Sequence, residues 1–151
     1  RPRFFLLGVY DGYLCEPLAN VLSDLGVRRA FVVYGEDRMD EISISAPTKV
    51  CELRDGYYRT ITITPEQFGF KRAFHSEIEG GDGEQNAEIL KQILKGELGG
   101  PKFDIVVLNA MFALYCADVV ASPAEAKPLI LEAIGSGKVY RYFENYVRGD
   151  A

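Results

Sequence analysis

The most constraining feature of this sequence is the run A-F-V-V at residues 30–33, which is apolar with no polar residue inside it. A strand that packs on one face alternates apolar and polar residues, whereas a strand buried on both faces is apolar throughout. The run is short and β-favouring, which argues for a strand rather than a helix. It therefore predicts an interior strand of a sheet covered by helices, as in an α/β protein.

The residues before this run extend the pattern. Residues 4–9 predict a second buried strand, and residues 16–25 predict a helix between the two strands. Four apolar residues of that helix recur at helical spacing and are expected to face the sheet: Leu18, Val21, Leu22 and Leu25. The order strand, helix, strand predicts a βαβ unit with parallel strands.

Two further β-rich runs, residues 48–53 and 57–63, are joined by Arg54-Asp55-Gly56. An Asp-Gly pair between such runs is a strong signal for a hairpin. We expect an antiparallel hairpin with one face in water. The predicted fold class is therefore α/β: part of a mostly parallel sheet flanked by helices, with an antiparallel hairpin. The later residues are expected to be helical, beginning with residues 83–95 behind a capping box of Asp82 and Gln85.

The loop after residues 30–33 is acidic and carries the candidate site. Asp40 and Glu41 are adjacent carboxylates just beyond the predicted strand, and such loops bind ligands in open α/β sheets. Mg²⁺ is often held by one or two carboxylates together with oxygens of a phosphorylated substrate. The pair therefore predicts a metal site, and the alternative is a solvated loop.

Residues 32–42, V-V-Y-G-E-D-R-M-D-E-I, resemble the V-V-H-G-x-D-G-L-D-E-[IL] signature of anthranilate phosphoribosyltransferases. Shorter matches to this family follow the chain in order: G-V at 8–9, L-G at 25–26, T-P-E-Q-F-G-F at 64–70, G-G-D at 80–82, N-A at 86–87 and L-N-A at 108–110. Tyr34 stands where the family usually has His, and Arg38 where it usually has Gly. Because Gly permits a backbone angle that Arg adopts with difficulty, the path of the loop is in question.

The resemblance implies an enzyme that transfers a phosphoribosyl group from phosphoribosyl pyrophosphate to anthranilate in tryptophan biosynthesis. It implies Mg²⁺ as the cofactor, held against the pyrophosphate by Asp40 and Glu41, and it assigns no catalytic residue to this chain. Residues 1–151 resemble only the carboxyl-terminal part of the α/β catalytic domain. The family's glycine-rich phosphate turn and its small N-terminal helical domain lie before the residues matched here. We therefore expect this chain alone to be inactive.

A half-domain of this kind would leave sheet edge and apolar surface uncovered. We expect it to pair with itself as a homodimer, to exchange elements, or to associate with the missing N-terminal half.

The composition excludes some classes of protein. A net charge of −5 argues against a nucleic-acid binder, which usually carries a basic face. The longest apolar run, residues 105–117, is too short for a membrane span, and no signal peptide is visible. Cys15, Cys51 and Cys116 lack metal or redox spacing. A reducing, cytoplasmic location is therefore expected.

Two alternatives remain: a non-enzymatic relative of the same fold that binds nucleic acid or a protein partner, and a pyrimidine nucleoside phosphorylase-like enzyme. The Asp-Glu pair and residues 64–70 favour the transferase. His75 has no partner at catalytic spacing. The G-G-D-G sequence at 80–83 favours a helix cap over a phosphate cradle, and Asn109 is expected to make a structural hydrogen bond rather than contact a substrate.

Overall fold

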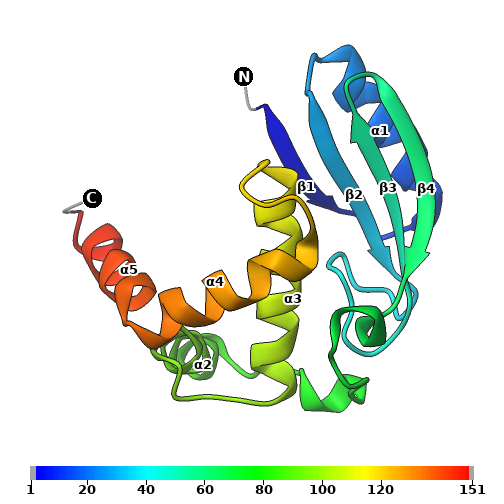
Figure 1. The fold of residues 1–151 in the computed structure, drawn as a ribbon. Helices are drawn as coiled ribbons and strands as arrows, with labels where there is room; N and C mark the ends of the chain where they lie inside the picture. Colours follow the sequence, from blue (N-terminus) through cyan, green and yellow to red (C-terminus); the bar gives the residue numbers. More distant parts are fainter. Residues whose placement is uncertain (1–2, 150–151) are drawn as a thin grey trace.

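The computed structural model describes residues 3–149, in which a four-stranded sheet carries helices on both faces (Figure 1). The strands lie side by side in chain order: β1 (Phe4–Gly8), β2 (Arg29–Gly35), β3 (Thr48–Arg54) and β4 (Tyr57–Ile63). The pair β1–β2 is parallel, whereas β2–β3 and β3–β4 are antiparallel. The α/β class and the hairpin are thus confirmed.

The sheet is mixed within these strands rather than mostly parallel, because only one of its three pairs is parallel. A parallel pair needs a crossover that brings the chain back along the sheet, usually a helix. Helix α1 (Cys15–Asp24) supplies that crossover between β1 and β2, whereas the loop between β2 and β3 contains no helix. The chain therefore returns antiparallel to β2.

Strand β2 is buried on both faces, as its apolar run predicts. Ala30 and Val32 pack in the cluster beneath α1, while Phe31 and Val33 pack in the larger cluster around α3 (Pro101–Cys116). This division follows from the two-residue period of a strand. The central strand thus joins two cores.

The face of α1 that meets the sheet matches the expected one only in part, because Leu18 and Leu22 pack in the cluster beneath the helix but Val21 and Leu25 do not. Cys15, Ala19 and Leu22 are buried, whereas Val21 and Leu25 are 49% and 55% exposed. The buried positions follow a spacing of four and three residues, and two of them are small. Small side chains let the helix backbone lie close to the sheet, and this selects a face that a count of large apolar residues misses.

The hairpin turns at Asp55-Gly56, where both residues have positive φ, as a type I′ turn requires. Strand β3 lies between two strands and is buried along most of its length, so the expected wet face is found only on β4. Glu52 of β3 is correspondingly buried.

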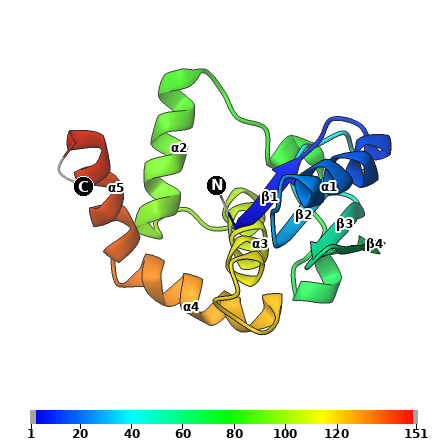
Figure 2. The same ribbon diagram turned by 90° about the horizontal axis from the view of Figure 1, so that it is seen from above.

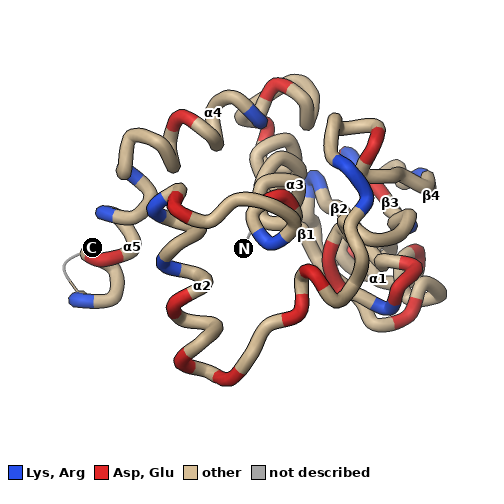
Figure 3. Tube along the Cα trace, turned by 90° about the horizontal axis from the view of Figure 1, so that it is seen from below, with Lys and Arg blue, Asp and Glu red and all other residues tan. Residues whose placement is uncertain are grey.

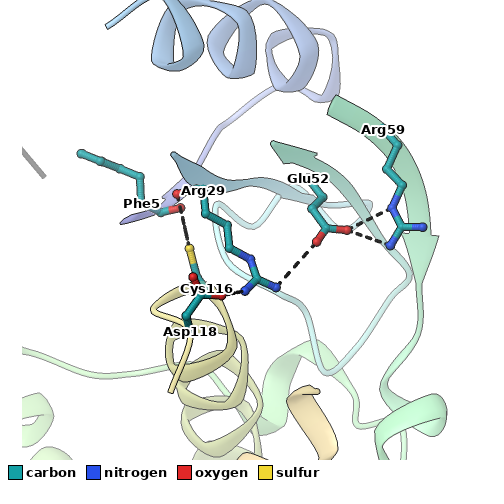
Figure 4. A network of polar contacts seen from close by, with 6 residues as sticks. All are labelled: Phe5, Arg29, Glu52, Arg59, Cys116 and Asp118. Carbon is teal, nitrogen blue, oxygen red and sulfur yellow. Dashed lines mark hydrogen bonds and ion pairs between the residues drawn. The ribbon is translucent and has the colours of Figure 1, made fainter. Parts of the chain in front are cut away.

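An ionic network around the buried side chains of Arg29 and Glu52 ties β2, β3 and the end of α3 together (Figure 4). Arg29 is 3% exposed and forms an ion pair with Asp118, and its Nη2 lies 3.8 Å from Glu52. Glu52 also accepts hydrogen bonds from Arg59 at 2.8 and 3.0 Å. The Arg29 guanidinium lies 4.0 Å from the centre of the Tyr115 ring. The network lies at the amino-terminal end of β2, opposite the end from which the acidic loop leaves.

The remaining elements follow the hairpin: η2 (Pro65–Phe68), η3 (His75–Glu77), α2 (Gly83–Lys95), α3, α4 (Pro123–Gly135) and α5 (Lys138–Arg148). Asp82 and Gln85 form the predicted capping box of α2. Figures 1 and 2 show α2, α4 and α5 on the side of α3 away from the sheet. A cavity of about 530 Å³ lined by apolar side chains lies among these four helices. No helix within residues 3–149 is long and apolar enough to cross a membrane.

Candidate functional site

The acidic loop begins where β2 ends and is closed by its own backbone. The N–H of Gly35 donates to the carbonyl of Met39, and the N–H of Arg38 donates to the carbonyl of Gly35, both at 2.8 Å. The next two residues are Asp40 and Glu41, and both are exposed. The predicted site residues therefore lie together at the carboxyl end of β2.

A third carboxylate of the loop, Asp37, turns inward and serves the loop itself. Its Oδ2 accepts a 2.7 Å hydrogen bond from the hydroxyl of Ser43, and that hydroxyl accepts hydrogen bonds from the backbone of the next turn. His75 Nδ1 lies 3.8 Å from the same carboxylate. Asp37 therefore supports the loop, and His75 lies beside this support.

The backbone of Asp40 rests on the end of β1. A Cβ built on Gly8 would lie 1.4 Å from the carbonyl oxygen of Asp40, which leaves no room for any side chain at Gly8. In the sequence, Gly8 is part of a G-V match to the family, and nothing there predicts its contact with Asp40. A glycine at a strand end signals a close backbone approach, but its partner is 32 residues away.

Ile42, the residue after Asp40 and Glu41, is held by hydrogen bonds from a side chain of α3. The Asn109 Oδ1 accepts from the N–H of Ile42, and its Nδ2 donates to the carbonyls of Ile42 and Ile105, each at 2.9 Å. The predicted structural hydrogen bond of Asn109 is confirmed. Its connection to the acidic loop could not be predicted, because 67 residues separate the two partners.

Arg38 adopts a φ of +72°, the left-handed region that favours glycine. The sequence-based expectation of an unfavourable angle at this position is therefore confirmed. In this conformation the N–H of Arg38 donates to the carbonyl of Gly35, so the loop closes with arginine at this position.

Replacing Arg38 with glycine is expected to raise the free energy of unfolding by about 1 kcal/mol, because the left-handed conformation costs a residue with a Cβ about that much. Thermal denaturation measures the effect. Glu36→Gly in the same loop is the matched control, since Glu36 does not have a positive φ and glycine there should be destabilising. Equal shifts for both variants would contradict the argument.

The electrostatics of the pair favour a bound cation. Partial desolvation, then the charge of Asp40 and a hydrogen bond with it, raise the pKa of the Glu41 carboxyl. Two adjacent carboxylates repel each other, and a divalent cation between them would remove that cost. Their carboxylate oxygens are hard ligands of the kind that Mg²⁺ prefers.

The donor set has the size expected for a cation shared with a substrate. Within the described residues, no group of three or more His, Cys, Asp or Glu side chains could hold a metal alone. Mg²⁺ bound through one or two carboxylates usually takes its other ligands from water and phosphates. Asp40 and Glu41 carry oxygen ligands of this kind, and their role as metal ligands stays a prediction.

A cavity of about 330 Å³ lies beside the pair. Its lining includes Glu41 and Asn109 together with apolar side chains from α3, from the loop and from Ile78, the residue after η3. Figure 3 shows further acidic positions along the segment that leads into α2. In that segment, Asp82 accepts the N–H of Gln85 at 2.9 Å, so the predicted helix cap is confirmed.

Curated relatives of this chain include anthranilate phosphoribosyltransferases. The chain is 50% identical over 139 residues to an anthranilate phosphoribosyltransferase of Symbiobacterium thermophilum, a match that covers 92% of this chain and 40% of that protein. The corresponding enzyme of Clostridium beijerinckii is 45% identical over 139 residues, with 92% and 41% covered. The chain therefore spans about two fifths of the length of the curated relatives it matches.

Solved structures show the same likeness. Anthranilate phosphoribosyltransferase from Thermus thermophilus superposes with a TM-score of 0.84 at 36% identity, covering 93% of this chain and 41% of that one. The Saccharomyces cerevisiae enzyme in complex with PRPP and Mg gives a TM-score of 0.85 at 25% identity, with 95% and 41% covered. Residues 1–140 match the model of the glycosyl transferase family, a/b domain. The resemblance seen in the sequence is thus confirmed, and the chain belongs to this glycosyl transferase family.

Proposed function

We propose that this chain is part of an anthranilate phosphoribosyltransferase, an enzyme that transfers phosphoribosyl from phosphoribosyl pyrophosphate to anthranilate in tryptophan biosynthesis. The observation that carries the proposal is the Asp40-Glu41 pair, set at the carboxyl end of β2 in a chain 50% identical to a relative of that name. The relative crystallised with PRPP and Mg supports the choice of ligands. The two alternatives, a non-enzymatic relative and a nucleoside phosphorylase, gain no support from these relatives.

In this proposal, Asp40 and Glu41 hold Mg²⁺ against the pyrophosphate. The bound cation would neutralise the negative charge that develops on the leaving group. Neither carboxylate attacks the sugar or moves a proton. Their task is to bind the cation and to orient it.

The remainder of the site would come from residues outside this chain, which spans about 40% of its first relatives. Strand β1 lies at the edge of the sheet, and all five of its residues are only half-buried. We propose that residues 1–151 are the carboxyl-terminal part of a larger catalytic domain and that the N-terminal part covers this edge. The chain alone would then be inactive and prone to pair with itself. The proposed location is the cytoplasm.

The test is the variant Asp40→Asn/Glu41→Gln in the intact protein. Metal stabilisation of a transition state contributes several kcal/mol, so the rate at a fixed Mg²⁺ concentration is expected to fall by about 100-fold or more. The assay follows phosphoribosylanthranilate formation as Mg²⁺ is varied. Asp24→Asn/Glu97→Gln is the control, because it removes two carboxylates that are also exposed but lie elsewhere. A site variant with the Mg²⁺ dependence of the unaltered protein would refute the metal assignment.

A further inference from the structure

The side chain of Asn109 makes three hydrogen bonds, all of them to the backbone. Its carbonyl oxygen accepts one hydrogen bond and its amide nitrogen donates two, all at 2.9 Å. One donor bond stays within α3, to the carbonyl of Ile105. The other two bonds reach across to the N–H and C=O of Ile42. The amide therefore pairs with Ile42 as a neighbouring strand would.

This pairing fixes the backbone next to Glu41. The N–H of Ile42 belongs to the same peptide plane as the carbonyl of Glu41, so holding the N–H orients that plane. Ile42 is itself 1% exposed and belongs to the core cluster around α3. On the other side, the carbonyl of Asp40 rests against Gly8. The backbone that carries the two carboxylates is therefore held on both sides, by Gly8 of β1 and by Asn109 of α3.

The part of α3 that carries Asn109 is tightly packed. Around Asn109, the helix buries Val107, Leu108, Met111 and Phe112, each at most 3% exposed. A group held by a packed helix keeps its position better than one held by a loop. Asn109 thus links the loop that carries the two exposed carboxylates to a packed helix of the core.

We propose that Asn109 is a positioning residue that sets the direction in which Asp40 and Glu41 present their carboxylates to the metal. The inference rests on the proposed function of that pair. Because Asp40 and Glu41 are the ligands that this chain would supply, a shift of their backbone changes the position of metal and pyrophosphate together. Partners behind metal ligands commonly change metal affinity by about 10- to 100-fold when they are removed.

The chain supplies a matched control. Asn86 holds Gly81 in the same way: its Oδ1 accepts the Gly81 N–H at 2.8 Å, and its Nδ2 donates to the Gly81 carbonyl at 3.0 Å. This second amide clamp lies at the start of α2, and no hydrogen bond of its side chain reaches the acidic loop within the residues described. A variant at Asn86 therefore loses the same kind of bond without touching the carboxylate pair.

The experiment compares Asn109→Asp, Asn109→Ser and Asn86→Asp in the intact protein. Asn109→Asp preserves shape and the acceptor for Ile42 but sets an oxygen against two carbonyls. Calorimetry measures the affinity for inorganic pyrophosphate with and without Mg²⁺, and steady-state assays measure the Mg²⁺ concentration giving half the maximal rate. For both Asn109 variants, we expect the gain in pyrophosphate affinity from Mg²⁺ to fall about tenfold. Excess Mg²⁺ should restore most of the rate, and Asn86→Asp should change neither quantity.

The outcomes separate the two proposals, with Asp40→Asn/Glu41→Gln measured alongside. If that double variant loses the effect of Mg²⁺ while both Asn109 variants change only the melting temperature, the positioning role is refuted and the metal site stands. If the double variant keeps the effect of Mg²⁺, the proposed function of the pair fails, and the positioning role fails with it. A variant that does not fold is replaced in the comparison by the other Asn109 substitution, and failure of both to fold would assign Asn109 a purely structural role.

Discussion

Replacing Arg29 with leucine is expected to lower the free energy of unfolding by about 3 kcal/mol, the low end of the cost of breaking a buried ion pair. Arg29 is 3% and Glu52 6% exposed, and without the arginine the glutamate keeps only Arg59, whose side chain is 70% exposed. The other partner, Asp118, is 46% exposed and can turn toward water, which limits the loss. Urea denaturation of the intact protein measures the change.

Two further variants test whether the loss of stability in Arg29→Leu comes from breaking a buried ion pair. Arg28 pairs with Asp55 at the surface, where both side chains are more than half exposed, so Arg28→Leu should cost less than about 1 kcal/mol. Arg29→Leu/Glu52→Leu removes the stranded charge together with its partner, and much of the lost stability should return. If Arg29→Leu costs no more than Arg28→Leu, the network does not contribute to stability as described.

Replacing Gly8 with alanine is expected to cost about 2–3 kcal/mol of stability, the scale of overpacking in a filled core. The new methyl group would lie 1.4 Å from the Asp40 carbonyl oxygen, and no side-chain rotation can relieve a clash with backbone. The Asp40 backbone must therefore move. Under the proposed function, the Mg²⁺-dependent rate should fall on the order of 100-fold, the cost of displacements of about 1 Å in a reacting site.

The control is Gly135→Ala at the end of α4, where a Cβ would meet no atom within 4 Å and φ is not positive. Alanine there should be neutral or slightly stabilising. The assays are phosphoribosyl transfer at varied Mg²⁺ and thermal denaturation of the intact protein. Unchanged transfer kinetics in Gly8→Ala would show that the orientation of the Asp40 carboxylate does not depend on the contact of its backbone with β1.

Local patterns sufficed to predict several elements. The apolar run at residues 30–33 predicts a strand buried on both faces because both faces need apolar residues, and β2 is such a strand. Asp55-Gly56 predicts its hairpin because a type I′ turn needs two positive φ values. The capping box of Asp82 and Gln85 predicts the start of α2. Each of these signals is complete within a few neighbouring residues.

Other features required the folded chain. The face of α1 depends on how closely a helix with small side chains can approach the sheet, and β3 pairs antiparallel because no helix returns the chain after β2. His75 lies beside Asp37, 38 residues earlier in the sequence. Helical periodicity and turn signals carry no information about partners at such separations.

The sequence by itself determined the class of fold, the family and the position of the two carboxylates, because these depend on periodicity, on turn chemistry and on a signature of adjacent residues. The tertiary structure alone decided what holds those carboxylates. Gly8 lies 32 residues before Asp40, and Asn109 lies 67 residues after Ile42. The physical reason is that both supports are contacts between distant parts of the chain, and such contacts form only when the sheet and α3 pack together.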